Sequence, residues 1–151
     1  MSLIFRYAQA KFQKPALSIG GRFVRPRPLI DLDIIGPKNT RDVVGLLDTG
    51  SDDTIFPEYI ARRIGIDLAH APSGLVSGLG KSQVAVRYAQ VQMRIVVATE
   101  TREWPAIIGF APHAMPYALL GFAGFLQFFT ATFHGDLEQV ELAVNRLYPG
   151  I

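Results

Sequence analysis

Apolar and polar residues alternate along much of the chain, which is the pattern of half-buried β-strands. Residues 30–34 alternate strictly and precede a turn at 36–39, and residues 43–47 form an almost continuous apolar run typical of a buried strand. Further strand patterns occur at 104–110, 117–121, 129–133 and 139–143. The last two flank the turn sequence His134-Gly135-Asp136 and therefore predict a closing hairpin.

Residues 57–65 have a helical pattern instead. This segment begins with proline, carries an acid in its first turn and two arginines in its last turn, and ends with glycine, which predicts a short capped helix. A second short helical segment is expected around 125–128. In between, apolar residues alternate on one phase over 84–88 and on the other over 91–97. We therefore expect one long strand that changes face at a bulge near residues 89 and 90.

The length of the chain and its turn residues predict one β-domain. The 151 residues fit an ordinary domain, and 14 glycines and 10 prolines spread along the chain favour many short strands over a helical bundle. Residues 1–27 have mixed polarity and predict an N-terminal arm or outer hairpin, and residues 28–151 predict the domain itself. The start of the chain has no basic run followed by an apolar stretch, so we expect a cytoplasmic protein.

Charge and composition argue against several classes of function. The formal net charge is +2 and the basic residues are scattered, so we expect no nucleic-acid partner. The chain has no cysteine, which excludes disulfides, thiol nucleophiles and thiolate metal sites. His70, His113 and His134 lack the spacing of metal ligands, so we expect neither a metal nor a cofactor. The apolar segment 117–133 is short and interrupted, so we expect it to be buried and not to span a membrane.

Asp48, Thr49 and Gly50 directly follow the apolar run at 43–47, and their chemistry suits acid proteolysis. A carboxylate can activate a water molecule, a small hydroxyl side chain can hold a turn by hydrogen bonding, and glycine lets the backbone approach the carboxylate closely. The tripeptide alone is short enough to occur by chance, so an ordinary turn aspartate remains an alternative at this point.

A longer pattern surrounds Asp48. The segment 46–55 (LLDTGSDDTI), the glycine-rich loop 74–80, and residues 119–121 (LLG) before a short apolar helix follow one another along the chain. In this order they resemble the retroviral-type aspartic proteases, the retropepsins, and their cellular single-domain relatives. The resemblance covers residues 28–143. It implies an all-β fold of the acid-protease type, with a small closed β-barrel, a flap hairpin and one or two short helices.

The resemblance also implies a role for each matching residue. Asp48 is implied as the catalytic aspartate, Thr49 as the residue that braces the two active-site loops of a dimer, and Gly50 as part of the substrate channel. The acids at 52–53 would contact the substrate, and the loop 74–80 would be the flap that closes over a peptide. The implied catalytic residues are Asp48, Thr49 and Gly50, and the implied substrate-binding residues are Ser51, Asp52, Asp53, Gly74, Leu75, Val76, Ser77, Gly78, Leu79, Gly80, Leu120 and Gly121.

Two positions depart from the retroviral pattern. The retroviral enzymes usually carry an arginine after the glycine of the second motif, where it pairs with the acid that corresponds to Asp52, whereas this chain has Phe122. The ion-pair network of the retroviral dimer is therefore absent or rebuilt. Many of those enzymes have alanine where this chain has Ser51. A hydroxyl there that hydrogen-bonds a carboxylate would favour the ionised form and a more acidic working range.

The number of motifs bears on the mechanism. Only one Asp-Thr/Ser-Gly sequence occurs in the chain, whereas acid proteolysis needs two carboxylates, one protonated and one ionised. A homodimer in which two Asp48 side chains meet across a two-fold axis would supply both, and it would act on a peptide or protein substrate. Two alternatives remain open: a catalytically silent retropepsin-like domain that serves dimerisation or peptide binding, and an unrelated β-barrel binding protein with an accidental motif.

Overall fold

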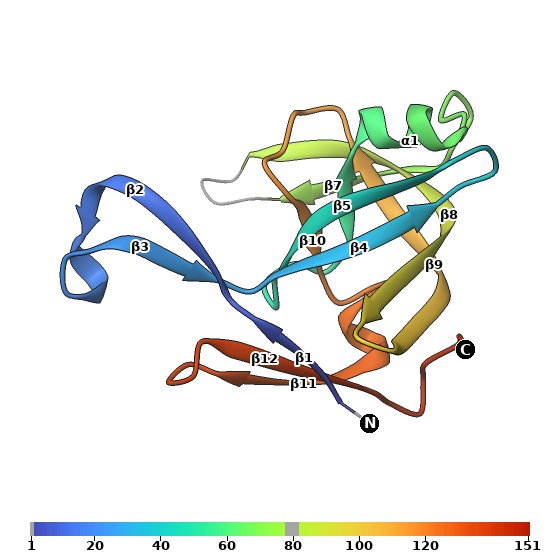
Figure 1. Ribbon diagram of the computed structural model, residues 1–151. Coiled ribbons are helices and arrows are strands. Elements are labelled where there is room, and N and C mark those ends of the chain that lie inside the picture. The colour runs from blue at the N-terminus through green and yellow to red at the C-terminus, as the bar shows by residue number, and fades with distance from the viewer. Residues whose placement is uncertain (1, 78–81) are drawn as a thin grey trace.

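The structure is a computed structural model and describes residues 2–77 and 82–151 (Figure 1). Strands account for most of these residues, as the sequence pattern predicts. They are β1 (Leu3–Arg6), β2 (Ala8–Ala16), β3 (Arg22–Arg27), β4 (Leu29–Ile35), β5 (Thr40–Leu47), β6 (Ile55–Pro57), β7 (Ser73–Ser77), β8 (Gln83–Val97), β9 (Glu100–Ala111), β10 (Ala118–Leu120), β11 (Phe129–His134) and β12 (Gln139–Val144). The described helical segments are α1 (Glu58–Ile64) and 3₁₀ turns at Leu17–Ile19 and Leu126–Phe128.

Six strands close into a ring. The largest sheet has the strand order β4-β5-β10-β6-β9-β8-β7, and β4 also pairs with β8. This extra pairing places Asp33 opposite Arg94, and their side chains form an ion pair at 2.8 Å. The ring from β4 to β8 therefore has no open edge, and β7 pairs with β8 outside it to form a hairpin. The connection of that hairpin, residues 78–81, lies outside the described residues.

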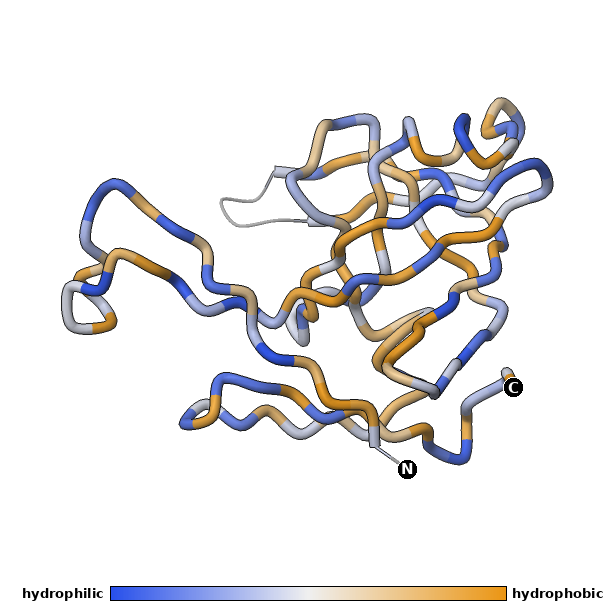
Figure 2. Tube along the Cα trace, viewed as in Figure 1, coloured by the Kyte–Doolittle hydropathy of each residue, from blue (hydrophilic) through white to orange (hydrophobic). Residues whose placement is uncertain are grey.

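Alternate side chains of the ring strands fill its interior. Ile30, Leu32 and Ile34 of β4 are buried, as the alternation predicts, and Trp104 of β9 is buried against them in the same core. Burial of each such side chain stabilises the fold by about 1.5–3 kcal/mol. Trp104 Nε1 donates to the carbonyl of Gly124 at 2.9 Å, which satisfies its polar atom. Hydrophilic residues gather at turns such as the one between β4 and β5 (Figure 2).

The predicted helix is confirmed as α1. Pro57 is its N-cap and Gly65 is its C-cap, with a φ of 87° at Gly65 that favours glycine. Glu58 and Arg62 form an ion pair at 3.1 Å across one helical turn. The second predicted helical segment is a single 3₁₀ turn at Leu126–Phe128. In the described part of the chain, no helix has the length and apolar character needed to cross a membrane.

The predicted bulge in the long strand is wrong. β8 pairs with β9 in continuous register over residues 87–97. The apolar pattern changes phase because the two ends of β8 are covered on opposite faces, and successive side chains of a strand point to opposite faces. Val86 belongs to a small cluster with Ile55 and Ala111, whereas Met93 lies in the main core.

Residues 1–27 contain a strand and a hairpin. β1 pairs with β12, which also pairs with β11, so β1 completes a three-stranded sheet. The predicted closing hairpin is confirmed as β11 and β12. β2 and β3 form a separate two-stranded sheet that projects from the body of the molecule (Figure 1). The division of the chain into units 1–27 and 28–151 stays a prediction.

Candidate active site

Asp48 follows β5 at the point where that strand ends against β10. The two strands lie parallel and in register, from the pair Gly45↔Ala118 to the pair Leu47↔Leu120. The backbone N–H of Asp48 donates to the carbonyl of Leu120 at 3.1 Å, which continues the pairing by one more bond. Two core strands therefore fix the backbone from which the Asp48 side chain projects.

The turn after β5 holds the Asp48 carboxylate with its own backbone. The N–H of Gly50 donates to Asp48 Oδ1 at 2.9 Å, and the N–H of Ser51 donates to the Asp48 carbonyl at 3.2 Å. A Cβ at Gly50 would lie 3.2 Å from the same Oδ1, so glycine suits this close approach. Asp48 is half-buried, and Thr49 beside it is exposed. One oxygen of the carboxylate is thus anchored by the loop.

The Asp48 loop is tied to the segment that follows β10. The N–H groups of residues 122–123 donate to the carbonyls of residues 51–52, both at 2.9 Å. A Cβ at Gly121 would lie only 2.2 Å from the carbonyl oxygen of Asp53, so this contact requires glycine. The first and last segments of the sequence pattern are therefore hydrogen-bonded neighbours.

The two departures from the retroviral pattern have different structural outcomes. The Ser51 hydroxyl donates to the backbone carbonyl of Asp53 at 2.7 Å and not to a carboxylate. The predicted hydrogen bond from Ser51 to a carboxylate is therefore wrong, because the hydroxyl proton locks the turn instead. Phe122 is 59% exposed. Its side chain cannot form the ion pair with Asp52 that an arginine would form.

Asp53 is held by a tyrosine of β8. The Tyr88 hydroxyl donates to Asp53 Oδ2 at 2.8 Å. Burial, the hydrogen bond to Asp53 and the charge of that carboxylate raise the pKa of Tyr88 to about 12. The phenol therefore stays protonated and remains a donor at neutral pH. This bond links the Asp48 loop to the strand that carries the β7–β8 hairpin.

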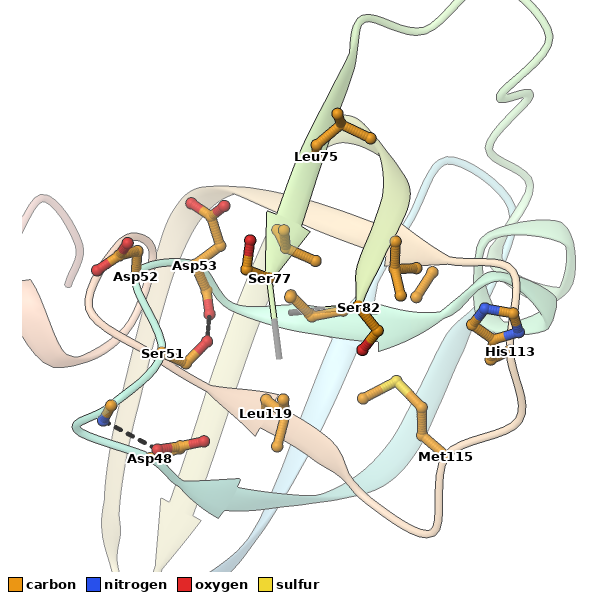
Figure 3. Close-up of a pocket in the computed structure, with 15 residues that line it drawn as sticks. Asp48, Ser51, Asp52, Asp53, Leu75, Ser77, Ser82, His113, Met115 and Leu119 are labelled. Atoms are coloured by element: carbon orange, nitrogen blue, oxygen red, sulfur yellow. Dashed lines mark hydrogen bonds between the residues drawn. The ribbon is translucent and has the colours of Figure 1, made fainter. Parts of the chain in front are cut away.

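A cleft of about 710 Å³ lies between the Asp48 loop and the β7–β8 hairpin (Figure 3). Its size is within the usual range for ligand sites. Its described lining contains the carboxylates of Asp48, Asp52 and Asp53, and these would attract positively charged groups. The described lining residues are Asp48, Gly50, Ser51, Asp52, Asp53, Ile55, Leu75, Val76, Ser77, Ser82, Val84, Ala111, His113, Met115 and Leu119.

Most of the predicted site residues that the structure describes meet in this cleft. They are Asp48, Gly50, Ser51, Asp52, Asp53, Leu75, Val76 and Ser77. Thr49 and Gly74 lie next to the lining in sequence but do not contribute to it. Gly78, Leu79 and Gly80, the central part of the predicted flap, lie outside the described residues.

Leu120 and Gly121 do not line the cleft. The Leu120 side chain is fully buried and covers Gly45, where a Cβ would lie 2.6 Å from it. Gly121 is buried against the Asp48 loop. The residue of β10 that does line the cleft is Leu119. Neighbouring residues of a strand point to opposite faces, so the burial of Leu120 sends Leu119 toward the cleft.

The sequence reasoning missed several lining residues. Leu119 could have been found by assigning the faces of β10 from alternation. Tyr88 does not line the cleft but was also missed, although it lies on the phase of β8 opposite to Val91, which indicates a side chain outside the main core. His113 and Met115 come from the connection between β9 and β10, where no periodic pattern exists. Their positions depend on the tertiary fold.

The three histidines lie apart from one another. His70 is exposed, His113 lines the cleft, and His134 Nε2 is 2.9 Å from Glu141 Oε2. Within residues 2–77 and 82–151, no three His, Cys, Asp or Glu side chains gather closely enough to hold a metal ion.

Comparison with solved structures shows that the fold is retropepsin-like. A retropepsin-like aspartic protease from Rickettsia conorii matches with a TM-score of 0.56 and 14% sequence identity, over 94% of this chain and 90% of that chain. EIAV protease, solved as a complex with an inhibitor, matches with a TM-score of 0.42 and 21% identity, over 63% of this chain and 81% of that chain. No model of a protein family and no curated protein matches the sequence. The first likeness extends over nearly the whole chain and confirms the fold that the three sequence segments implied.

Proposed function

We propose that the protein is an aspartic endopeptidase that hydrolyses peptide bonds with a water molecule activated by Asp48. The observation that carries this proposal is the position of the Asp48 carboxylate. The Gly50 N–H holds one of its oxygens at 2.9 Å, and the carboxylate faces a cleft of about 710 Å³ below the β7–β8 hairpin. A carboxylate in this position can accept the proton of a water molecule that attacks a peptide carbonyl.

The reaction also needs an acid, and one chain supplies one Asp48. In a homodimer with a two-fold axis beside the site, the ionised Asp48 accepts the proton of the water. The protonated Asp48 of the second copy donates toward the carbonyl oxygen of the substrate. The exposed Thr49 leaves its hydroxyl free to reach the loop of the second copy. The functional unit in this proposal is the dimer.

The proposed substrate is an extended peptide that lies beside β7. This strand is the last one in its sheet and pairs only with β8 in the described part of the chain, so the backbone groups of its outer edge are available. A peptide can add to such an edge through main-chain hydrogen bonds. The carboxylates of Asp52 and Asp53 at the cleft favour peptides with basic side chains near the cleaved bond.

Replacement of Asp48 by asparagine tests the proposal. Asp48→Asn keeps the size and much of the hydrogen bonding of the side chain but can act neither as acid nor as base. Cleavage of a fluorogenic peptide library should fall by about 10³-fold or more. Asp42→Asn makes the same substitution at an exposed position of β5, the strand that precedes Asp48, and should leave cleavage unchanged. Equal activity of Asp48→Asn and the parent, with contaminating protease excluded, contradicts the proposal.

The same assay distinguishes the proposed protease from the alternative of a catalytically silent peptide-binding domain. A wild-type protein that binds extended peptides but cleaves none between pH 3 and 8 would be a binding domain with a retropepsin-like fold. Peptide binding is measured by fluorescence anisotropy with labelled members of the library. Catalysis requires both binding and an Asp48-dependent product.

A further inference from the structure

The hairpin formed by residues 8–27, called the arm below, has several exposed apolar side chains. Its strands β2 and β3 pair only with each other among the described strands. Leu17 is 85% exposed, Phe23 is 57% exposed and Phe12 is 40% exposed. A two-stranded hairpin alone is marginally stable in water. The arm therefore has an apolar surface that a partner would bury.

Contacts near both ends of the arm, at Arg27 beside its base and at Arg22 beside its turn, fix its direction. The Arg27 side chain donates a hydrogen bond to the hydroxyl of Tyr117. Arg22 and Glu138 form an ion pair at 3.0 Å. Both contacts are polar, so they orient the arm without covering its apolar side chains. The arm thus projects from the body in a defined direction (Figure 1).

The arm and the rest of the chain carry opposite charge. The arm holds five of the 15 basic residues and none of the 13 acidic residues. The remaining residues therefore carry ten basic and 13 acidic side chains, a formal net charge of −3. Lys11 and Lys14 of the arm are exposed. The body of a second copy of this chain has the charge that the arm would attract.

The base of the arm lies beside the candidate active site. The Leu47 N–H, one residue before Asp48, donates to the carbonyl of Pro28, one residue after the arm. Figure 1 shows that the arm projects on the side where β5 ends. If two copies meet at Asp48, the second copy occupies this side. The nine residues of β2 span roughly 30 Å at about 3.3 Å per residue, which is long enough to cross much of a second copy.

We infer that the arm of each copy docks on the body of the second copy and clasps the homodimer. The inference rests on the proposed function, because it uses the pairing of two Asp48 loops. The apolar residues near the tip pack on the partner, and the basic residues face its acidic surface. The position of the arm base beside Asp48 favours a second copy over a membrane surface or a nucleic acid, since neither of these would need that position.

Two arm variants and one matched control test the inference. Leu17→Ser combined with Phe23→Ser removes apolar surface, and Lys11→Glu combined with Lys14→Glu lowers the charge of the arm by four. Lys38→Glu combined with Arg41→Glu makes the same charge change at the exposed far end of the β4–β5 hairpin. Sedimentation velocity over a concentration series should show a dimer dissociation constant at least about tenfold higher for both arm variants and unchanged for the control.

The remaining measurements separate the possible outcomes. Circular dichroism should show the same secondary structure in all variants, because the substituted side chains are exposed. Unchanged dimerisation of both arm variants would overturn the inference. Loss of binding to phosphatidylserine vesicles or to a single-stranded oligonucleotide, with unchanged dimerisation, would assign the arm to those partners instead. Peptide cleavage by the wild type is assayed in parallel, so a failure of the arm inference leaves the proposed function intact.

Discussion

The hydrogen bond between Tyr88 and Asp53 couples the two sides of the cleft. Asp53 is also held at its backbone by the Ser51 hydroxyl at 2.7 Å, so its position depends on both the Asp48 loop and β8. Gly74 of β7 lies against the Tyr88 ring, where a Cβ would be 3.0 Å from the nearest ring atom. A movement of the β7–β8 hairpin would therefore displace Tyr88 and change the orientation of the Asp53 carboxylate.

Tyr88→Phe should weaken peptide binding and remove a pH-dependent contribution to stability. Folding favours the protonated phenol, so its contribution is complete below pH 10 and is lost as the pH rises toward the pKa of about 12. Below pH 10 we expect the variant to lose about 1 kcal/mol of stability and to have a higher KM with a nearly unchanged kcat.

Thermal melts, peptide kinetics and alkaline ultraviolet titration of tyrosine measure these effects. Tyr59→Phe, at an exposed tyrosine of α1, is the control and should change neither the melts nor the kinetics, and it should keep the high-pH step that Tyr88→Phe removes from the titration. If Tyr88→Phe loses as much stability relative to the wild type at pH 11 as at pH 8, the role assigned to Tyr88 is contradicted.

At the scale of elements, the sequence is informative where one local signal decides the structure. The helix caps Pro57 and Gly65 and the alternation in β4 predicted α1 and β4 correctly. The long strand β8 was harder to predict, because a change in the phase of its apolar residues can have two physical causes. One is a bulge, and the other is that the core covers a different face of the strand at each end. β8 has the second cause, and the covering clusters come from segments distant in sequence. The same limit explains why Leu120 was assigned to the cleft in place of Leu119.

Gly121→Ala should destabilise the junction between the Asp48 loop and the segment after β10. The added Cβ would lie 2.2 Å from the Asp53 carbonyl oxygen and 2.5 Å from that of Ser51, so the backbone must shift. We expect a loss of about 2–4 kcal/mol, measured as a melting temperature lower by about 5–15 °C. Gly135→Ala is the control, because its Cβ meets nothing within 4 Å. Equal melting temperatures of the two variants would show that the junction tolerates the shift.

At the scale of the whole molecule, the closure of the ring could not be read from the sequence. The β4–β8 pairing joins segments about 60 residues apart, and no local signal states which strands pair over such distances. The all-β class and the retropepsin-like fold were predictable because three short segments occur in the order of that fold. The arm was predicted as an outer hairpin, but its position beside Asp48 depends on the Leu47–Pro28 hydrogen bond. One copy supplies one Asp48 carboxylate, so the pH dependence of cleavage tests whether a second carboxylate shares its proton.

Peptide cleavage should follow a bell-shaped pH profile with its maximum below neutrality. Two carboxylates that share one proton provide an acid and a base together only in the singly protonated state. At lower pH both are protonated and no base remains, and at higher pH both are ionised and no acid remains. Mutual repulsion of the two charges extends the pH range of the singly protonated state above the pH at which carboxyl groups ordinarily ionise. The extended range still lies below neutrality.

The measurement is kcat/KM across pH 3–8 at a protein concentration well above the dimer dissociation constant, with the dimer fraction checked by sedimentation at each pH. The check of the dimer fraction excludes subunit dissociation as the cause of the fall in activity on either side of the maximum. His113→Gln removes an imidazole that lines the cleft and should keep the bell. Asp48→Asn should abolish activity at every pH while the dimer persists. A single sigmoidal rise that continues to pH 8 in the wild type would contradict a shared proton, because it would require only one titrating base.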